Sequence, residues 1–380
     1  MLPSLDPHLV AGIIVAMAFS LGIQVFPLLR RERCACLFSL VMAAAYYGRE
    51  FPGFALVSGF AFILARWLAR EPLAARRWGL ACLAIALLVI GFTAGRVAHW
   101  DRLVDVGARI TVAVYSLGMW PVLKLVTLFW EVGSGSLAAP SFTRFALWSC
   151  LPFTIGGPVL RMSQMPAAVV ADGQLWKSIG WWREAIAAAA KLAAGISLGT
   201  GLAFLTGHWP QDHYLNNAVA AFLTGPIGFY LTTAGYFHWM ELLGRVSGFK
   251  LPPSFNYPIG RENISAFWMN WNMTATYVFR DYLFYNRWGR RTYNVYFNTI
   301  LLFTLVGLWH AANAYWILWG FLHGLLFASF LLWRRFGQRL RNIPLRGTPL
   351  SKTAARALTY FSVCMCWYLP SKILQKLAAI

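Results

Sequence analysis

Charged residues are scarce in this chain of 380 residues. They make up 12% of it, whereas soluble domains carry about 25%. Acidic residues are the scarcest, with 13 Asp and Glu against 33 Lys and Arg, while hydrophobic residues reach 59% and mean hydropathy is +0.55. A soluble protein of this composition would expose large apolar patches, so a soluble globular fold is excluded. In a bilayer only helices and closed barrels satisfy their backbone groups, and the long apolar runs favour helices.

Signals for metal and nucleotide chemistry are also lacking. The six cysteines lie in or beside apolar segments, and the pairs Cys34/Cys36 and Cys364/Cys366 are two residues apart. Residues two positions apart on a helix point in directions about 200° apart, so the two thiols of neither pair can bind the same metal ion. The sequence has no phosphate-binding glycine loop and no evident Ser-His-Asp arrangement. We therefore expect no bound metal or cofactor.

Long apolar runs recur along the whole chain, and a spanning helix needs about 20 such residues. We expect one all-α domain over residues 1–380, a polytopic membrane protein with about 11 transmembrane or re-entrant helices around a central cavity. The candidate spans are residues 8–28, 35–48, 53–67, 78–96, 106–130, 142–160, 180–207, 215–243, 294–309, 313–333 and 355–369.

The net charge of +20 comes from Lys and Arg at the ends of these runs. This is the pattern of the positive-inside bias rather than of a solvated nucleic-acid patch, so we expect a lipid bilayer as partner and no nucleic acid. The basic loop at 334–356 should be cytoplasmic and the N-terminus outside. The basic clusters would also favour anionic lipid or an acidic carrier protein.

Residues 244–293 break the apolar pattern, because nine charged residues lie there among many aromatics. The part at 264–284 predicts a half-buried or re-entrant helix that lines a cavity. Leu-Pro-Pro at 251–253 and Tyr-Pro at 257–258 predict an extended approach to it.

His310 and His323 are the candidate functional histidines, because a polar group at membrane depth is costly and is by default functional. His310 follows the run 301–309, and His323 lies in the next apolar segment beside Gly324. A neutral imidazole can take a proton from a hydroxyl group at physiological pH. A structural histidine bonded to a neighbouring helix would look the same in the sequence, and His323 is the weaker candidate because Gly324 indicates close helix packing.

Four stretches, taken in order, resemble the membrane-bound O-acyltransferase family. They are Gly157-Pro158-x-x-Arg161, the run at 235–258 that ends in Asn-Tyr-Pro, the block FWMNWN…RDY within 267–289, and the block GLWH…HG within 307–326. The resemblance covers about residues 105–330, with the specific blocks at 264–326. It is strongest to the branch of alginate O-acetyltransferase and teichoic-acid D-alanyltransferase.

The resemblance implies a membrane-embedded acyltransferase in the plasma membrane, the inner membrane of a bacterium. Such an enzyme moves an acyl group from a cytoplasmic thioester, either acyl-CoA or an acyl carrier protein, to a hydroxyl of a cell-envelope glycan. An acidic carrier or a periplasmic accessory protein is the expected partner. His310 and Asn272 would be catalytic. The substrate-binding candidates are Arg161, Trp268, Trp271, Arg280, Trp309 and His323.

Other interpretations stay open at this point. The polysaccharide branch usually has histidine at position 272, and asparagine there is typical of relatives that acylate lipids, so a lipid or small-molecule hydroxyl is the alternative acceptor. Arg280 with Asp281 could be a structural pair, and Arg161 could pin a helix end. A transporter would show paired repeats with broken helices, which this chain does not. A scaffold without activity would not need both His310 and Asn272.

Overall fold

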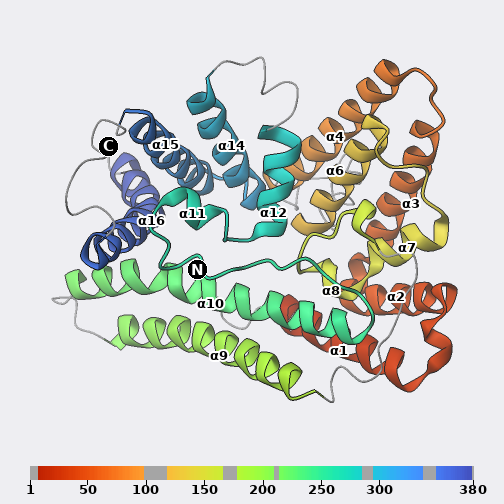
Figure 1. The fold of residues 1–380 in the computed structure, drawn as a ribbon, viewed down its shortest axis with the longest axis horizontal. Coiled ribbons are helices and arrows are strands. Elements are labelled where there is room, and N and C mark those ends of the chain that lie inside the picture. Colours follow the sequence, from red (N-terminus) through yellow and green to blue (C-terminus); the bar gives the residue numbers. More distant parts are fainter. Residues whose placement is uncertain are drawn as a thin grey trace. The chain divides into compact units, whose positions relative to one another are not determined.

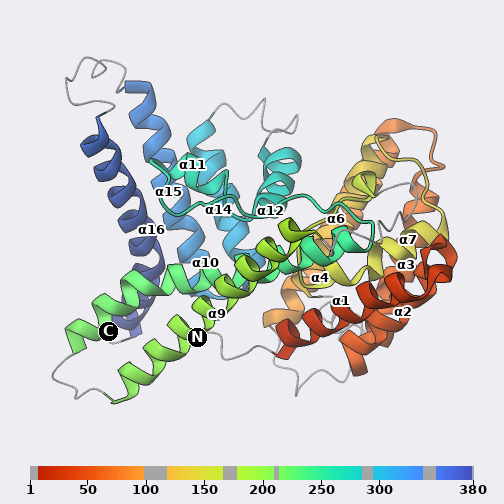
Figure 2. The ribbon, with the colours of Figure 1, turned by 60° about the horizontal axis from the view of Figure 1, so that its bottom comes forward.

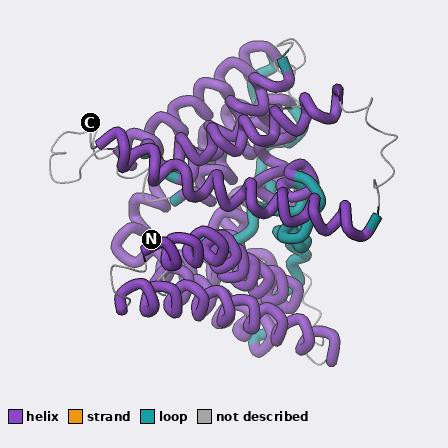
Figure 3. The backbone as a smooth tube through the Cα atoms, turned by 90° about the vertical axis from the view of Figure 1, so that its left-hand side faces the viewer, coloured by secondary structure: helices purple, strands orange, loops and turns teal. Residues whose placement is uncertain are grey.

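The computed structural model describes residues 7–97, 118–165, 178–208, 214–284, 294–336 and 348–378. Within these ranges the backbone is helix or loop and contains no strand (Figure 3). The all-α prediction is confirmed, while the count of about 11 membrane helices stays a prediction.

In the first half of the chain the helices are α1 (Pro7–Val25), η1 (Pro27–Arg30), α2 (Glu32–Tyr47), η2 (Gly48–Glu50), α3 (Phe51–Leu68), α4 (Ala74–Val97), α6 (Met119–Ser134), α7 (Phe142–Cys150), α8 (Pro152–Ile155) and η4 (Met162–Gln164). In the second half they are α9 (Ile179–His208), α10 (Tyr214–Val246), α11 (Ile264–Trp268), α12 (Met273–Val278), the π-helical turn η7 (Phe279–Phe284), α14 (Val295–His310), α15 (Ala314–Phe336) and α16 (Pro349–Ala378).

Among the described residues, four helical stretches are long and apolar enough to cross a bilayer. They are His8–Val25, Glu32–Leu68, Ala74–Thr93 and Ala314–Phe336. The second of these runs through α2, η2 and α3, so the predicted spans 35–48 and 53–67 form one helical stretch. It bends at Gly48, whose φ of 53° suits a residue without a side chain.

The predicted span at 142–160 is wrong, because α7 ends at Cys150 and the chain turns before α8. Pro152 causes the break, since the residue before a proline is driven out of helical geometry, and Leu151 is extended with ψ 115°. Buried Lys124 of α6 stabilises the turn. Its Nζ donates to the carbonyl of Trp148 at 2.6 Å and to Thr154 Oγ1 at 2.9 Å, which satisfies backbone that the interrupted helix leaves unpaired.

The chain divides into two compact units. The N-terminal unit comprises Leu5–Ala190 and Gly235–Pro253, and in it α1 packs on α2, α2 on α7, and α4 on α6 (Figure 1). The C-terminal unit comprises Lys191–Ala234 and Ser254–Ile380, and in it α14 packs on α15 and α15 on α16 (Figure 2). The prediction of a single domain stays a prediction.

Helices α14 and α15 form a hairpin whose axes approach closely because glycines face each other. A Cβ built at Gly307 would overlap the carbonyl oxygen of Trp316, and one at Gly320 would overlap that of Phe303. The connection is short, and Asn313 Oδ1 accepts a hydrogen bond from the Trp316 amide at 3.0 Å, which caps the start of α15. The hairpin fixes the end of α14, where His310 lies.

Gly320→Ala is expected to destabilise the protein, because its methyl group has no room between the two helices. Overpacking of this kind costs about 1–3 kcal/mol. The measurement is the apparent Tm of the detergent-purified protein, obtained from the fraction that still elutes as a single species after heating. Gly59→Ala in α3 is the matched control, since a Cβ there meets no atom within 4 Å. Equal Tm values for the two variants would contradict the close contact.

Candidate active site

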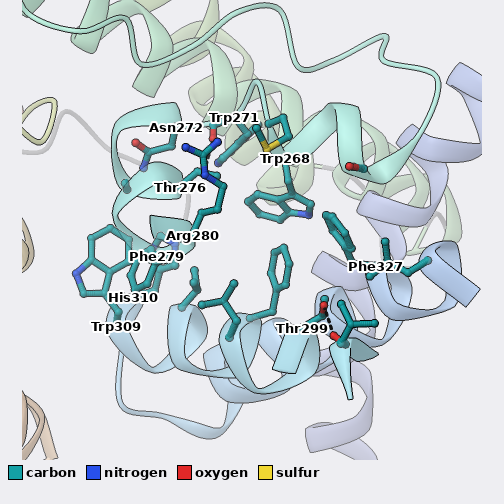
Figure 4. Close-up of a pocket in the computed structure, with 18 of the residues that line it drawn as sticks. Trp268, Trp271, Asn272, Thr276, Phe279, Arg280, Thr299, Trp309, His310 and Phe327 are labelled. Carbon is teal, nitrogen blue, oxygen red and sulfur yellow. Dashed lines mark hydrogen bonds between the residues drawn. The ribbon is translucent and has the colours of Figure 1, made fainter. Parts of the chain in front are cut away.

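The C-terminal unit contains a pocket of about 340 Å³, a volume in the range of small-molecule sites. Figure 4 shows the side chains that line it. They come from α11, the turn after it, α12, η7, α14 and α15. Most of the wall is apolar, and a few polar side chains interrupt it.

Six of the eight predicted site residues line this pocket. They are Trp268, Trp271, Asn272, Arg280, Trp309 and His310. The two sequence blocks at 267–289 and 307–326 therefore meet at one cavity. In the view of Figure 4, Asn272, Arg280 and His310 lie toward one side of the pocket, while Trp268 and Phe327 lie toward the other.

His310 is the last residue of α14 and is surrounded by indole rings. The ring of Trp316 stacks on the imidazole with centroids 4.7 Å apart and planes 19° apart, and Trp319 meets it edge-on at 5.5 Å. The chain leaves the helix directly afterwards, since Ala311 is extended. The imidazole is thus held in one orientation at the pocket wall while remaining partly accessible.

Asn272 lies in the turn that joins α11 to α12 and has a left-handed backbone, with φ 39° and ψ 55°. Its Oδ1 is buried and accepts no hydrogen bond from the described residues. Amide groups can both donate and accept without titrating, so this side chain offers an uncommitted carbonyl group at the pocket. The expected re-entrant helix over 264–284 is therefore a series of three short helical segments rather than one.

Arg280 belongs to the π-helical turn η7, a geometry that is frequent at functional sites. Its Nε donates to Asp281 Oδ1 at 2.8 Å, and its guanidinium lies 4.5 Å from the ring centre of Tyr277. The side chain also lines the pocket. Arg280 is thus part of an ion pair and part of the cavity wall at once.

Sequence reasoning missed Arg334, which lines the pocket from the exposed end of α15. Phe327, Leu331 and Arg334 all line the pocket and follow one another at spacings of four and three residues, the helical period. That spacing was the available signal. Phe303 and Thr276 were missed as well and carry no signal of their own.

His323 is not among the pocket-lining side chains. It is fully buried on α15, its Nδ1 lies 2.9 Å from the carbonyl oxygen of Trp319, and its ring meets those of Trp319 and Trp268 at 4.2 and 5.2 Å. His323 therefore packs against Trp268, which lines the pocket. This agrees with the close helix packing that Gly324 indicated. Its predicted part in substrate binding stays a prediction.

Arg161 belongs to the N-terminal unit, in a loop that Trp148 ties down through a hydrogen bond from Nε1 to the Leu160 carbonyl at 2.8 Å. Its predicted contact with substrate is not tested by this geometry. The basic residues at 287–291, which belong to the charged stretch 244–293, are outside the described residues.

Two other kinds of site can be assessed. Residues 195–199 spell Gly-x-Ser-x-Gly, but they lie inside helix α9 rather than on a strand-to-helix turn, so they do not form a nucleophile elbow. In the ranges that the structure describes, no three His, Cys, Asp or Glu side chains gather closely enough to hold a metal ion.

Comparison with known proteins agrees with the motifs. The chain is 38% identical over 86 residues to a probable alginate O-acetylase of Azotobacter vinelandii, 30% identical over 189 residues to the peptidoglycan O-acetyltransferase of Helicobacter pylori, and 35% identical over 89 residues to the teichoic acid D-alanyltransferase of Bacillus subtilis. The resemblance to membrane-bound O-acyltransferases is confirmed. The matches take in 22%, 45% and 20% of this chain and 17%, 34% and 22% of those proteins.

The matched part of the chain thus spans about a third or less of the length of these curated relatives. No family model matches it. Together with the four apolar helices, the relatives identify the chain as a membrane protein.

His323→Ala is expected to act through stability. Removing a large buried side chain costs about 2–5 kcal/mol, because the cavity it leaves closes only in part. The Tm in detergent should therefore fall, while a lipid-reconstituted variant below its Tm should keep more acyl transfer than His310→Ala. A His323→Ala protein that is as stable as the wild type yet inactive would contradict the packing role.

Proposed function

We propose that this protein is a membrane-embedded O-acyltransferase that moves an acyl group from a thioester to a hydroxyl group. The observation that carries the proposal is that His310 and Asn272, from two separate sequence blocks, lie on the wall of one pocket. The named activities of the relatives, O-acetyl transfer and D-alanyl transfer, support the same reaction class.

In the proposed reaction the imidazole of His310 takes the proton of the acceptor hydroxyl. The oxygen attacks the thioester carbonyl carbon, a C–O bond forms, and the C–S bond breaks. The thiolate leaves and recovers the proton from the imidazolium, so the enzyme ends as it began. Stacking against Trp316 fixes the plane of the imidazole ring, so the ring nitrogen that takes the proton keeps a constant direction toward the hydroxyl group. No covalent acyl-enzyme is needed.

Asn272 is proposed to orient either the thioester or the imidazole. Its amide is neutral, so it can sit in an apolar pocket at less cost than a carboxylate. Its NH₂ group can donate to the thioester carbonyl as negative charge develops on the oxygen, which is the interaction that accelerates acyl transfer most. Its Oδ1 has no partner among the described residues and can accept from an imidazole N–H.

The donor is proposed to enter from the cytoplasmic side as acyl-CoA or an acyl carrier protein. Both carry phosphate, and two arginines, Arg280 and Arg334, line a pocket that is otherwise mainly apolar. Guanidinium groups pair with phosphate through parallel hydrogen bonds, while the apolar wall suits the acyl chain. Arg334 is exposed at the end of α15, which supports a role in binding a donor phosphate at the pocket entrance.

The acceptor is proposed to be a hydroxyl of a cell-envelope glycan, and the location the bacterial inner membrane, where cytoplasmic thioester and envelope polymer can be joined. The relatives named for alginate, peptidoglycan and teichoic acid support an envelope polymer. A periplasmic accessory protein or an acidic carrier would then be the partner.

His310→Ala is expected to lower kcat by at least about 100-fold, the usual contribution of a general base. The first measurement is the ester-linked acyl content of envelope glycans and lipids, released by mild alkali, in cells without the gene and in cells complemented with either form. The second is turnover by purified, monodisperse protein with a single acceptor. Near-normal turnover by His310→Ala would refute the mechanism.

Asn272→Ala should also reduce kcat, whereas Asn272→His should keep more activity because histidine can serve as donor at the same position. The comparison is made on the same acceptor, with the Tm of each variant as the control for folding. Equal losses in Asn272→Ala and Asn272→His would mean that the amide itself is required.

Arg334→Glu is expected to raise the donor KM by about 10-fold or more, because it replaces a phosphate-pairing group with a repulsive one, and a lost charge-assisted hydrogen bond costs about 1.5–3 kcal/mol. Arg335→Glu is the matched control, since Arg335 is the exposed neighbour that does not line the pocket. The measurement is initial rate against donor concentration. Equal KM changes in both variants would reduce the effect to general surface charge.

A further inference from the structure

Two residues other than glycine have a positive φ in the part of the chain that the structure describes, and both lie near the pocket turn. They are Tyr257, with φ 46°, and Asn272, with φ 39°. Asparagine tolerates this conformation, but an aromatic residue rarely adopts it. Such backbone persists where the surroundings hold it in place, and it gathers at functional sites.

The backbone around these two residues is paired. The amide of Asn256 donates to the carbonyl of Asn270 at 3.0 Å, and the amide of Met273 donates to the carbonyl of Ser254 at 2.6 Å. These two bonds flank Asn272 on either side. The loop at 254–258 therefore lies against the turn that carries Asn272. The prediction of an extended approach is wrong at Tyr257, whose φ of 46° is left-handed.

The side chain of Arg261 joins the two segments of this contact, the 254–258 loop and the 270–273 turn. The guanidinium of Arg261 donates through Nη2 to the Asn256 carbonyl at 2.6 Å and to Asn270 Oδ1 at 3.1 Å, and through Nε to the Tyr257 carbonyl at 3.0 Å. Asn270 in turn donates through Nδ2 to the Ala266 carbonyl of α11 at 2.7 Å. The rigid guanidinium thus connects the strained loop residue, the turn and the helix before it.

Arg261 itself does not line the pocket, and one of the residues it holds, Asn270, is two positions away from Asn272. Its Nε and Nη2 donate to oxygens of the 254–258 loop and of Asn270, so these hydrogen bonds are made within the protein. Its partners are all acceptors, and a planar fork reaches several of them without rearranging.

We propose that Arg261 is a positioning residue, which holds the 254–258 loop against the 270–273 turn and thereby keeps Asn272 in the left-handed conformation with which it lines the pocket. The inference rests on the proposed function of Asn272 and assigns the arginine no contact with substrate. Loss of the guanidinium lets Tyr257 and Asn272 relax toward ordinary backbone angles, and the amide then leaves its place at the pocket.

Arg261→Ala is expected to lower kcat by about 10- to 100-fold with little change in donor KM, because a misplacement of about 1 Å at a catalytic group can cost 100-fold. Arg261→Lys, which keeps the charge but not the fork, should lie between Arg261→Ala and the wild type. Glu262→Gln is the matched control. Glu262 is the next residue of the same loop, and its side chain pairs with Arg356 at 3.2 Å rather than with the turn.

The decisive measurement is a double-mutant cycle with Asn272→Ala, on purified protein supplied in parallel with acetyl-CoA and an acetylated acyl carrier protein. If Arg261 acts through Asn272, then Arg261→Ala removes nothing further in the Asn272→Ala background, because residues that act as a unit are not additive. Multiplied losses, or wild-type kcat in Arg261→Ala, would overturn the positioning role.

His310→Ala in the same assay separates this inference from the proposed function. If His310→Ala retains full turnover, the proposed function fails. If His310→Ala is inactive and Arg261→Ala is normal, only the positioning role fails. Amide hydrogen exchange in peptides covering 254–273 adds a readout that needs no substrate, since Arg261→Ala should speed exchange there and Glu262→Gln should not.

Discussion

The candidate site depends on the contact of backbone against backbone where α14 meets α15. Gly307 and Gly320 leave no side chain between the helices, so the two axes come close. Trp316 and Trp319, about one turn apart near the start of α15, then stand beside His310 at the end of α14. Trp319 also contacts His323 and Trp268 of α11. The close approach at the glycine pair therefore helps to position both His310 and Trp268 at the pocket.

In this arrangement the aromatic side chains hold the site rigid, and a different, smaller set of side chains carries the polar groups. Indole rings supply large buried surfaces with few rotatable bonds, which hold an imidazole in place at low entropic cost. Fewer of the lining side chains carry an imidazole, an amide or a charge: His310, Asn272, Arg280 and Arg334. An apolar pocket with sparse polar groups strengthens each electrostatic contact made inside it, and this is the condition under which a single amide or imidazole can matter to a reaction.

The sequence predicted the helices that are set by hydrophobic length and missed what depends on tertiary contacts. The spans proposed at 78–96, 294–309 and 313–333 agree with α4, α14 and α15 to within a few residues. The span at 142–160 failed because Pro152 stops the helix and buried Lys124 compensates the break, and hydropathy registers neither effect. The two site blocks were recognisable as motifs. The hydrogen bonds of Arg261, which join the 254–258 loop to the 270–273 turn, are tertiary contacts that no local sequence pattern predicts.

The asparagine at position 272 can be understood from its backbone. With φ 39° the position excludes β-branched and most bulky residues, and the residues enriched there besides glycine are Asn, Asp and His. Glycine would bring no functional group, and aspartate would bring a charge into a pocket whose wall is mainly apolar. Asn and His are the two that satisfy the backbone and still offer a neutral donor and acceptor. The exchange between histidine in the polysaccharide branch and asparagine here is therefore one that the turn itself permits, so the identity of this residue does not by itself divide glycan acceptors from lipid ones.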